Sequence, residues 1–219
     1  MKFFYSKMKF VDEKLIYFDM YNWTNDLPEN CNSRQDFLDI LDYFNFSFNT
    51  LHQKTKILEI GTYTGISLIH ILKHIPNSTA QIIDKWSNYN ENNLLQNIDF
   101  TKVEQAFYIN MKISGQFDKI SNIYNDDSYK VLMNYLKTNQ KFDLIYVDGS
   151  HKCLDCYLDI ELSFELLNDK GILIIDDVPY LKDQILESPF EAVMHFLKRN
   201  EERYRILKNN YRLFLQKIR

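Results

Sequence analysis

The feature that most constrains the fold is a regular alternation, from residue 56 onward, of short apolar runs with longer segments of helical spacing. The apolar runs resemble buried strands and lie at residues 56–60, 80–84, 119–124, 142–148 and 171–177. The segments between them repeat their apolar residues at helical spacing and lie at residues 65–75, 101–112, 128–138 and 153–168. Strand and helix in alternation predict an α/β fold, with a parallel sheet covered by helices on both faces.

The C-terminal end of the chain predicts one more helix and then a hairpin. The helix is expected at about residues 190–202, and two apolar runs follow it on either side of the pair Asn209-Asn210, which is typical of a tight turn. Together with the five earlier runs, these strands predict a doubly wound, mostly parallel sheet of seven strands that ends in an antiparallel hairpin. Thr101 and Glu104 form a capping-box pair that predicts the start of the helix at 101–112.

Residues 1–52 do not follow the alternation. Residues 34–44 place Phe37, Ile40, Leu41 and Phe44 on one helical face, and Pro28 interrupts the segment before them. We expect residues 1–52 to form an N-terminal helical appendage that caps a substrate pocket. Residues 53–219 would then form the main domain.

Charge and cysteine content limit the setting in which the protein works. The formal net charge is −4, which argues against a surface that grips nucleic acid throughout. No apolar run approaches the roughly 18 residues of a membrane-spanning helix, so we expect no membrane contact. An odd number of cysteines, 3, favours a reduced, cytoplasmic location.

Glycine is scarce, with 5 in 219 residues. Each glycine therefore marks a place where the backbone needs a conformation or a close approach that other residues do not readily allow. Gly61 and Gly65 lie in the loop after the first strand, at the edge of the sheet where ligands of such folds bind. We expect Gly61 to allow close approach of a ligand and Gly65 to let the helix pack against the strand. The dinucleotide motif has a third glycine, and Glu59 would repel a phosphate here. Asp84 ends the second strand and is suited to accept ribose hydroxyls.

Three carboxylates also end neighbouring strands. Asp148 follows the fourth apolar run, and Asp176 and Asp177 end the fifth. If these strands are adjacent, the carboxylates converge and need a cation or shared protons to offset their repulsion. Oxygen ligands in this number suit Mg²⁺, Mn²⁺ or Ca²⁺. His151 is the best candidate for a general base, because the ordinary pKa of a histidine side chain lies near neutrality.

The loop sequence Leu-Glu-Ile-Gly-Thr-Tyr-Thr-Gly-Ile-Ser resembles the S-adenosylmethionine loop of class I methyltransferases, which have a Rossmann-like fold. It is most similar to the catechol O-methyltransferase type and to the macrocin O-methyltransferase and cephalosporin-hydroxylase-like group. The resemblance implies that Tyr63 and Ser67 hold the methionine end of the cofactor, that Asp84 binds its ribose, and that the Asp127-Ser128 pair contacts adenine. The complete set that we assign to the cofactor is Glu59, Gly61, Thr62, Tyr63, Gly65, Ser67, Asp84, Trp86, Asp127, Ser128 and Asp148.

The same resemblance implies a divalent metal, most simply Mg²⁺, held by Asp148, Asp176 and Asp177. Catechol-type enzymes have Asn where this chain has Asp177, and the macrocin-like group has acidic pairs there, which favours a sugar or natural-product acceptor. The sequence Val-Asp-Gly-Ser-His also resembles a motif of that group, but Ser150 replaces an acid and Cys153 stands where Tyr is usual. Both differences concern the substrate pocket.

We therefore expect an S-adenosylmethionine-dependent O-methyltransferase that acts on a hydroxyl of a small molecule or sugar, with His151 and Asp148 as catalytic residues. One alternative is an RNA- or N-directed methyltransferase, since residues 198–219 carry eight Lys and Arg. A non-catalytic cofactor-binding module, an NAD-dependent dehydrogenase and a homo-oligomer are also left open. Simpler structural roles are available to single residues: Trp86 in the core, Asp127, Ser128 and His151 as helix caps, and Asp148 in an Asp-Gly turn.

Overall fold

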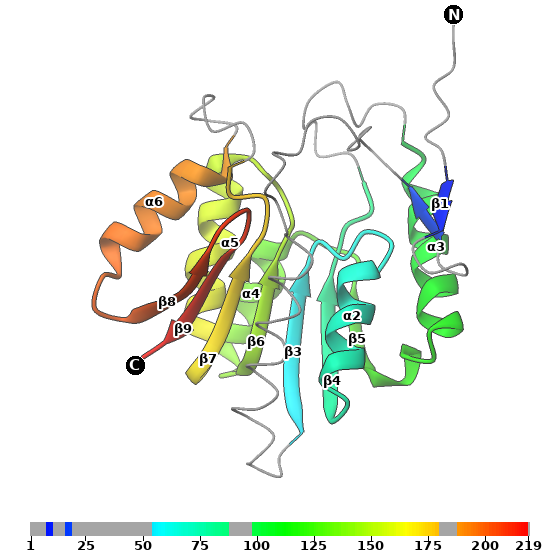
Figure 1. The fold of residues 1–219 in the computed structure, drawn as a ribbon, viewed down its shortest axis with the longest axis horizontal. Coiled ribbons are helices and arrows are strands. Elements are labelled where there is room, and N and C mark those ends of the chain that lie inside the picture. The colour runs from blue at the N-terminus through cyan, green and yellow to red at the C-terminus, as the bar shows by residue number, and fades with distance from the viewer. Residues whose placement is uncertain (1–7, 11–15, 19–53, 88–97, 180–187, 219) are drawn as a thin grey trace, which may run out of the picture.

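A mixed sheet organises the described part of the chain, which in this computed structural model comprises residues 8–10, 16–18, 54–87, 98–179 and 188–218. The strands of the sheet are β3 (Thr55–Ile60), β4 (Ser78–Ile83), β5 (Ile120–Tyr124), β6 (Phe142–Val147), β7 (Leu167–Ile175), β8 (Tyr204–Asn209) and β9 (Leu213–Lys217). They lie in the order β5-β4-β3-β6-β7-β9-β8 (Figure 1). The first five are parallel, and β9 is antiparallel to both β7 and β8. The predicted fold class is confirmed.

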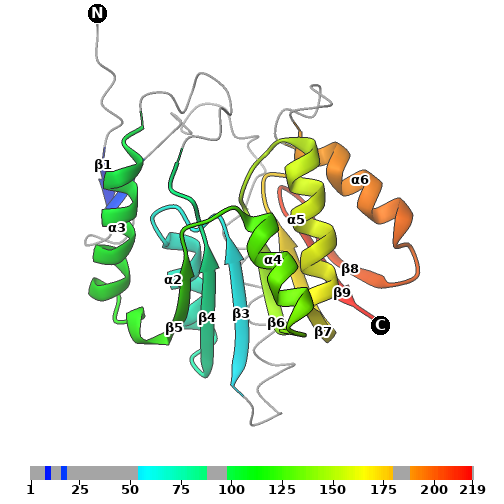
Figure 2. The ribbon, with the colours of Figure 1, turned by 180° about the vertical axis from the view of Figure 1, so that it is seen from behind.

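Helices cover both faces of this sheet. They are α2 (Ile66–His74), α3 (Phe100–Ile113), α4 (Ser128–Lys137), α5 (Cys153–Leu166) and α6 (Pro189–Arg199), with a 3₁₀ turn, η2, at Phe117–Lys119. One apolar core joins α2 and α3 to one face of the sheet, and a second core joins α4, α5 and α6 to the other face. Figure 2, a view from behind, shows this second face toward the reader. The central strands are therefore apolar on both faces, as a doubly covered parallel sheet requires.

The ends of the central strands are level with one another. Ile60 pairs with Val147, and Val147 pairs with Ile175. Backbone hydrogen bonds continue past these pairs, from Asp148 N to Ile60 O at 2.8 Å and from Asp176 N to Val147 O at 3.0 Å. The residues after β3, β6 and β7 are therefore held side by side at one edge of the sheet.

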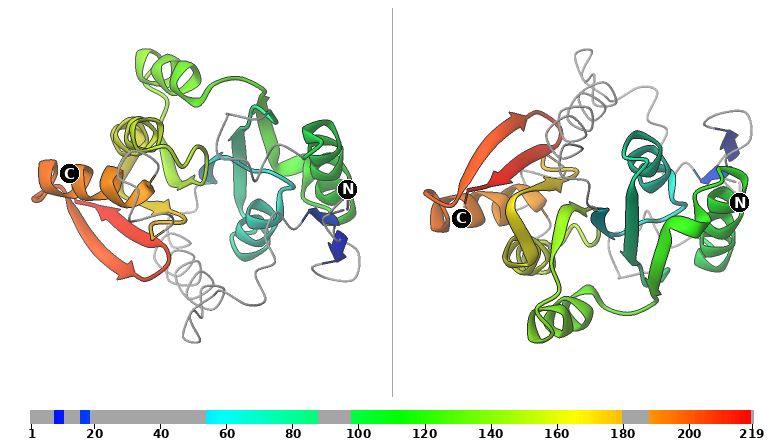
Figure 3. Two further views of the ribbon diagram at one scale, coloured as in Figure 1. Left: turned by 90° about the horizontal axis from the view of Figure 1, so that it is seen from above. Right: turned by 90° about the horizontal axis from the view of Figure 1, so that it is seen from below.

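The described residues of the N-terminal segment and the C-terminal hairpin lie at opposite ends of the molecule (Figure 3). The described residues of the segment form two short antiparallel strands, β1 (Met8–Phe10) and β2 (Ile16–Phe18), and β2 lies beside α3. The helix predicted at residues 34–44 lies outside the described residues, and the role of residues 1–52 as a cap stays a prediction. Among the described helices, none is long and apolar enough to cross a bilayer.

Two local predictions differ from the structure. The N-cap of α3 is Asp99, whose carboxylate accepts a hydrogen bond from Lys102 N, so the helix begins one residue before the predicted Thr101–Glu104 capping box. Strand β7 begins at Leu167 instead of 171, because Lys170 takes a left-handed φ of 65° and the register with β6 shifts between Phe142 and Leu144. Residues 167 and 168, which helical periodicity had assigned to the preceding helix, therefore belong to this bulged strand.

Candidate functional site

The loop after β3 is packed against the loop after β6. Gly61 has φ 81°, and a Cβ added there would overlap the carbonyl oxygen of Asp148 and lie 2.8 Å from Cα of Gly149. The side of Gly61 on which a side chain would lie is therefore filled by protein, and the approach of a ligand to this loop stays a prediction. Glycine is needed here because the two loops approach backbone to backbone, and this contact places the glycine loop directly beside Asp148.

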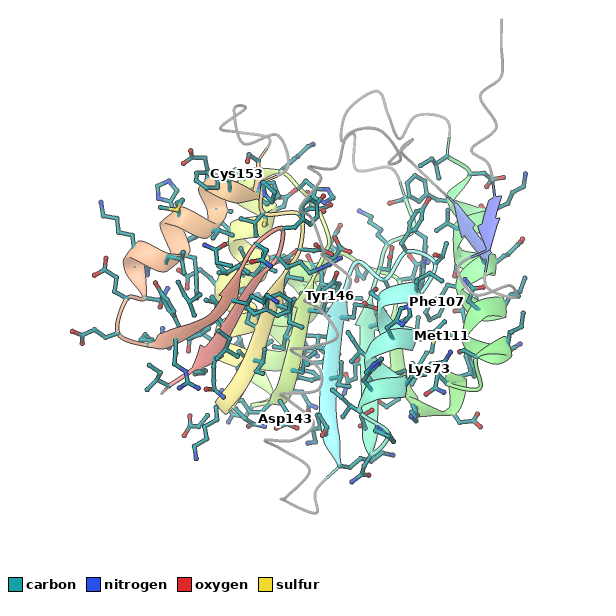
Figure 4. The ribbon with its side chains drawn as sticks, in the orientation of Figure 1. Lys73, Phe107, Met111, Asp143, Tyr146 and Cys153 are labelled. Atoms are coloured by element: carbon teal, nitrogen blue, oxygen red, sulfur yellow. The ribbon has the colours of Figure 1, made fainter. Side chains whose placement is uncertain are left out.

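Gly65, which precedes α2, lies close to α3. Its φ is 81°, and an added Cβ would lie 2.9 Å from the ring of Phe107 and 3.4 Å from Sδ of Met111. Both side chains belong to α3 and point toward α2 (Figure 4). The absence of a side chain at Gly65 leaves room for these two side chains of α3, while α2 itself packs on the sheet, Ile57 of β3 included.

Glu59, the residue before the strand end, is buried, and only one of its two carboxylate oxygens has a hydrogen-bond partner among the described residues. Its Oε1 accepts a hydrogen bond from the hydroxyl of Ser67 at 2.5 Å. Its Oε2 is buried without a hydrogen-bond partner among the described residues. Burial raises the pKa of Glu59 to about 7. A buried carboxylate oxygen without a partner is costly, so this position suits a polar or cationic ligand group that would complete it.

Asp84 and Trp86 hold the glycine loop from the neighbouring strand. Oδ2 of Asp84 accepts from Tyr63 N and Oδ1 accepts from Trp86 N, both at 2.7 Å. Trp86 is 6% exposed, donates from Nε1 to the carbonyl of Tyr63 at 2.9 Å, and packs against Phe107 with ring centroids 5.4 Å apart. Burial raises the pKa of Asp84 to about 6. The structure thus places Trp86 in the core, and the ribose contact of Asp84 stays a prediction.

Asp127 and Ser128 lie at the start of α4, after β5. Asp127 forms ion pairs with Lys85 at 2.6 Å and with Lys130 at 3.2 Å, and its side chain does not cap the helix. Ser128 hydrogen-bonds the buried Asp159 of α5, whose pKa burial raises to about 7. The pair therefore ties the loops after β4 and β5 together on the same edge as Asp84. A role in adenine binding remains a prediction.

Asp148, His151 and Asp177 come together at the ends of β6 and β7. Each offers one ligand atom, and these three atoms lie within 4.8 Å of one another. Nε2 of His151 lies 3.1 Å from Oδ2 of Asp177. Burial, and then the charges of Asp176 and Asp177, raise the pKa of Asp148 well above its usual value. Burial alone would also raise the pKa of Asp177, but hydrogen bonds from His151 and Tyr211 outweigh it and lower that pKa.

Asp176, the third predicted metal ligand, lies outside this cluster. Its Oδ1 accepts from Nε of Arg212 at 2.9 Å and from Asp177 N at 2.8 Å, and its Oδ2 accepts from the hydroxyl of Tyr146. Figure 4 shows Tyr146 in the middle of the sheet, on β6. The cluster that the structure assembles contains two of the three predicted carboxylates, together with His151.

Tyr211 and Arg212 are site residues that the sequence analysis did not identify. They lie in the turn between β8 and β9, and β9 is antiparallel to β7 with Leu213 opposite Ile175. Arg212 is therefore the next residue along toward Asp176. The turn signal at Asn209-Asn210 was recognised, and the register that it sets would have placed these two side chains beside the acids.

The basic C-terminal segment is largely committed to contacts within the protein. Arg203 pairs with Glu165 at 2.7 Å, and Arg212 pairs with Asp176. Lys217 is buried, and its Nζ donates to the carbonyl oxygens of Phe164 and Leu167 at the end of α5. These contacts use basic side chains that we had considered for RNA.

Comparison with known proteins agrees with this arrangement. Residues 58–178, more than half of the chain, match the model of a methyltransferase domain family. No curated protein matches the chain. The fold is similar to that of the O-methyltransferase TomG from Streptomyces achromogenes, solved in complex with SAM, at a TM-score of 0.58 and 16% identity over 89% of this chain and 84% of TomG.

Two further solved structures share the fold. The O-methyltransferase from Bacillus cereus in complex with SAH has a TM-score of 0.58 and 12% identity over 89% of this chain and 94% of its own. The calicheamicin methyltransferase CalS11 has a TM-score of 0.56 and 13% identity over 84% of this chain and 80% of its own. With a family model matched across the glycine loop and both acidic strand ends, the chain belongs to the methyltransferase domain family and has the fold of the class I S-adenosylmethionine-dependent methyltransferases.

Proposed function

We propose that the protein transfers the methyl group of S-adenosylmethionine to a hydroxyl group of a small molecule or sugar, with help from a divalent cation. The observation that carries the proposal is the contact between Gly61 and Asp148. It places a glycine loop with an unsatisfied carboxylate directly beside a cluster of two carboxylates and an imidazole. A methyl donor bound at the loop and an acceptor bound at the cluster would meet there.

The glycine loop fits the donor in charge as well as in shape. The donor carries a sulfonium and an ammonium group, and Oε2 of Glu59 is a buried acceptor without a partner among the described residues. Asp84, on the next strand, is held by two backbone donors and still has lone pairs for a hydroxyl. We therefore assign Glu59 to the cationic end of the donor and Asp84 to its ribose.

The donor set of the cluster also fits a divalent cation. Asp148 and Asp177 each offer a carboxylate oxygen within 4.8 Å of the other, which is compatible with one shared ion held beside His151. When bound, such an ion would lower the pKa of an acceptor hydroxyl and orient it. Among the predicted ligands, Asp176 has both carboxylate oxygens occupied, by Arg212, by Tyr146 and by the backbone of Asp177, and it would have to give up a partner to take part.

His151 is suited to remove the proton of the acceptor. Nε2 faces Asp177, and when the imidazole is neutral a proton on Nε2 leaves Nδ1 as the nitrogen that can accept another. Asp177 then fixes the orientation of the ring and stabilises the imidazolium that forms, as carboxylates do beside catalytic histidines. The oxygen attacks the methyl carbon, the carbon–sulfur bond breaks, and the electron pair remains on sulfur.

A natural-product or sugar hydroxyl is the acceptor class that we favour. TomG is described as involved in tomaymycin synthesis, and CalS11 is a calicheamicin methyltransferase. An RNA acceptor has less support, because Arg203, Arg212 and Lys217 are engaged within the protein.

Calorimetric titration of the full chain with S-adenosylhomocysteine (SAH), the demethylated product of the donor, tests the proposal. We expect saturable binding in the micromolar range, followed by transfer of labelled methyl from S-adenosylmethionine to members of a panel of hydroxylated sugars and phenols. Absence of SAH binding at roughly millimolar concentration, which corresponds to less than about 4 kcal/mol of binding free energy, would overturn it.

A further inference from the structure

The turn of the C-terminal hairpin is built onto the acidic end of β7. Arg212 reaches Oδ1 of Asp176 at 2.9 Å, and the carbonyl of Tyr211 accepts a hydrogen bond from Val178 N at 3.2 Å. Tyr211 also hydrogen-bonds Asp177 through its side chain. Two side chains and one backbone group of the turn therefore hold three consecutive residues that follow β7.

The two adjacent acids are held in different ways. Both oxygens of Asp176 are occupied, by Arg212, by the hydroxyl of Tyr146 and by the backbone of Asp177. Asp177 takes a left-handed φ of 51°, and its side chain joins the cluster at His151 instead. The conformation of the chain therefore directs Asp176 toward Arg212 and Asp177 toward His151.

The pair of Arg212 and Asp176 is largely withdrawn from water. The side chain of Arg212 is 20% exposed and that of Asp176 is 6% exposed. Once two opposite charges are this deeply buried, removing one partner leaves an uncompensated charge, so each strongly holds the other. Asp176 would have to give up this partner to bind an ion.

We propose that Arg212 is a positioning residue, which holds Asp176 out of the cation-ligand set and fixes how many carboxylates the site offers. This inference rests on the proposed function, because it concerns the cation assigned to the cluster. The positive charge of Arg212 compensates the negative charge of Asp176. The remaining two carboxylates, Asp148 and Asp177, then hold the ion loosely enough to leave coordination positions for the acceptor.

Removal of Arg212 should therefore strengthen cation binding while it slows the reaction. Arg212→Gln deletes a positive charge near the ion and releases Asp176 as an additional ligand. We expect Mn²⁺ to bind roughly tenfold more tightly, from the change in Coulomb energy alone. We expect turnover to fall, because the additional ligand would occupy a position that the acceptor needs. A merely structural role for Arg212 would weaken both quantities together.

Titration of Mn²⁺, followed by electron paramagnetic resonance and by calorimetry at saturating SAH, tests the inference on four proteins. They are the wild type, Arg212→Gln, the double variant Arg212→Gln/Asp176→Asn, and Arg205→Gln as a matched control. Arg205 lies on the same hairpin and bonds Gln216 at the surface. The double variant leaves no buried charge without its partner, so it folds more readily than the single variant.

We expect tighter Mn²⁺ binding in Arg212→Gln, and affinities within about threefold of wild type in the double variant and the control, since the deleted charges cancel in the former. Unchanged or weaker binding by Arg212→Gln would show that Arg212 does not keep Asp176 away from the ion and would overturn the inference. A loss of more than roughly tenfold in the double variant would show that Asp176 already binds the ion in the wild type and would also overturn it. Absence of Mn²⁺ binding in every protein would overturn it as well. Failure of the proposed function is distinct, because it would appear as absent SAH binding and absent methyl transfer in the wild type.

Discussion

At the scale of single residues, the site depends on charges that are held where water does not reach them. Glu59 is fully buried, and one of its oxygens has a partner in Ser67 while the other has none among the described residues. The acid in this loop was predicted from its place before the glycine. Its burial was not, because nothing in the local sequence shows which strands cover it.

The raised pKa of Glu59 predicts a pH dependence of stability in the absence of ligands. Its pKa rises from 4.5 to about 7 on folding through burial. The folded state therefore binds more protons than the unfolded state between these values, and stability from this group is lost as pH rises through the window. Relative to wild type, Glu59→Gln should gain about 2–3 kcal/mol of unfolding free energy between pH 5 and pH 8. Urea unfolding at both pH values measures this, and parallel changes in the two proteins would contradict the assignment.

His151 should affect turnover far more than donor binding. Replacing a general base typically costs about 10²–10⁴ in rate. We therefore expect His151→Ala to lower kcat within that range and to leave the affinity for SAH within about threefold, since the proposed donor site lies on the other side of the Gly61 contact. His195→Ala, on α6, is the matched control and should leave both quantities unchanged. Equal losses of kcat in the two variants would remove His151 from the mechanism.

At the scale of elements, strand and helix positions were predicted well because each segment has a clear period, and boundaries were predicted less well. The N-cap Asp99 was missed in favour of the capping-box pattern at Thr101 and Glu104. The start of β7 was missed because Lys170 and Gly171 form a bulge that periodicity alone does not show. Tyr211 and Arg212 were missed for a different reason, since their role depends on the register of β9 against β7.

The packing of the glycine loop against the loop after β6 predicts a large effect for Gly61→Ala. The added methyl group would overlap the backbone of Asp148, in addition to the cost of a φ of 81°. We expect a loss of about 3–5 kcal/mol of unfolding free energy, from overpacking and backbone strain together. We also expect SAH binding to be lost, because the loop would move.

Gly115→Ala is the control for that variant. Gly115 has a φ of 69°, and nothing lies within 4 Å of an added Cβ. Its cost should therefore be the backbone strain alone, about 1–2 kcal/mol, with SAH binding retained. Thermal unfolding and calorimetry of the two variants measure both effects. Equal destabilisation by the two substitutions would show that the contact between the loops carries little energy.

At the scale of the whole molecule, the proposed site lies at one edge of the sheet, to which distant parts of the chain contribute. The loops after β3, β6 and β7 are level there, and the hairpin turn between β8 and β9 closes the same edge from the C-terminal end. The alternation of strands and helices predicted that the acids converge. It did not predict that Arg212, in the turn between β8 and β9, supplies the positive charge that pairs with Asp176.

Binding of SAH should stabilise the folded protein as a whole. A ligand that binds only the native state at about 100 times its Kd adds roughly 2.7 kcal/mol. For a chain of 219 residues this corresponds to a rise in Tm of roughly 5–10 °C. Thermal unfolding with and without SAH measures the shift, and Gly61→Ala should show none. A wild-type Tm that does not change with SAH concentration would count against a donor site in this edge.

The central claim is that a methyl donor and its acceptor meet between the glycine loop and the acidic strand ends. A crystal structure of the protein with SAH tests it most directly. We predict SAH at the loop after β3, with its cationic end at Glu59, its ribose at Asp84 and its sulfur facing the side of Asp148 and His151. SAH bound elsewhere, or bound with its sulfur turned away from these two side chains, would contradict the account.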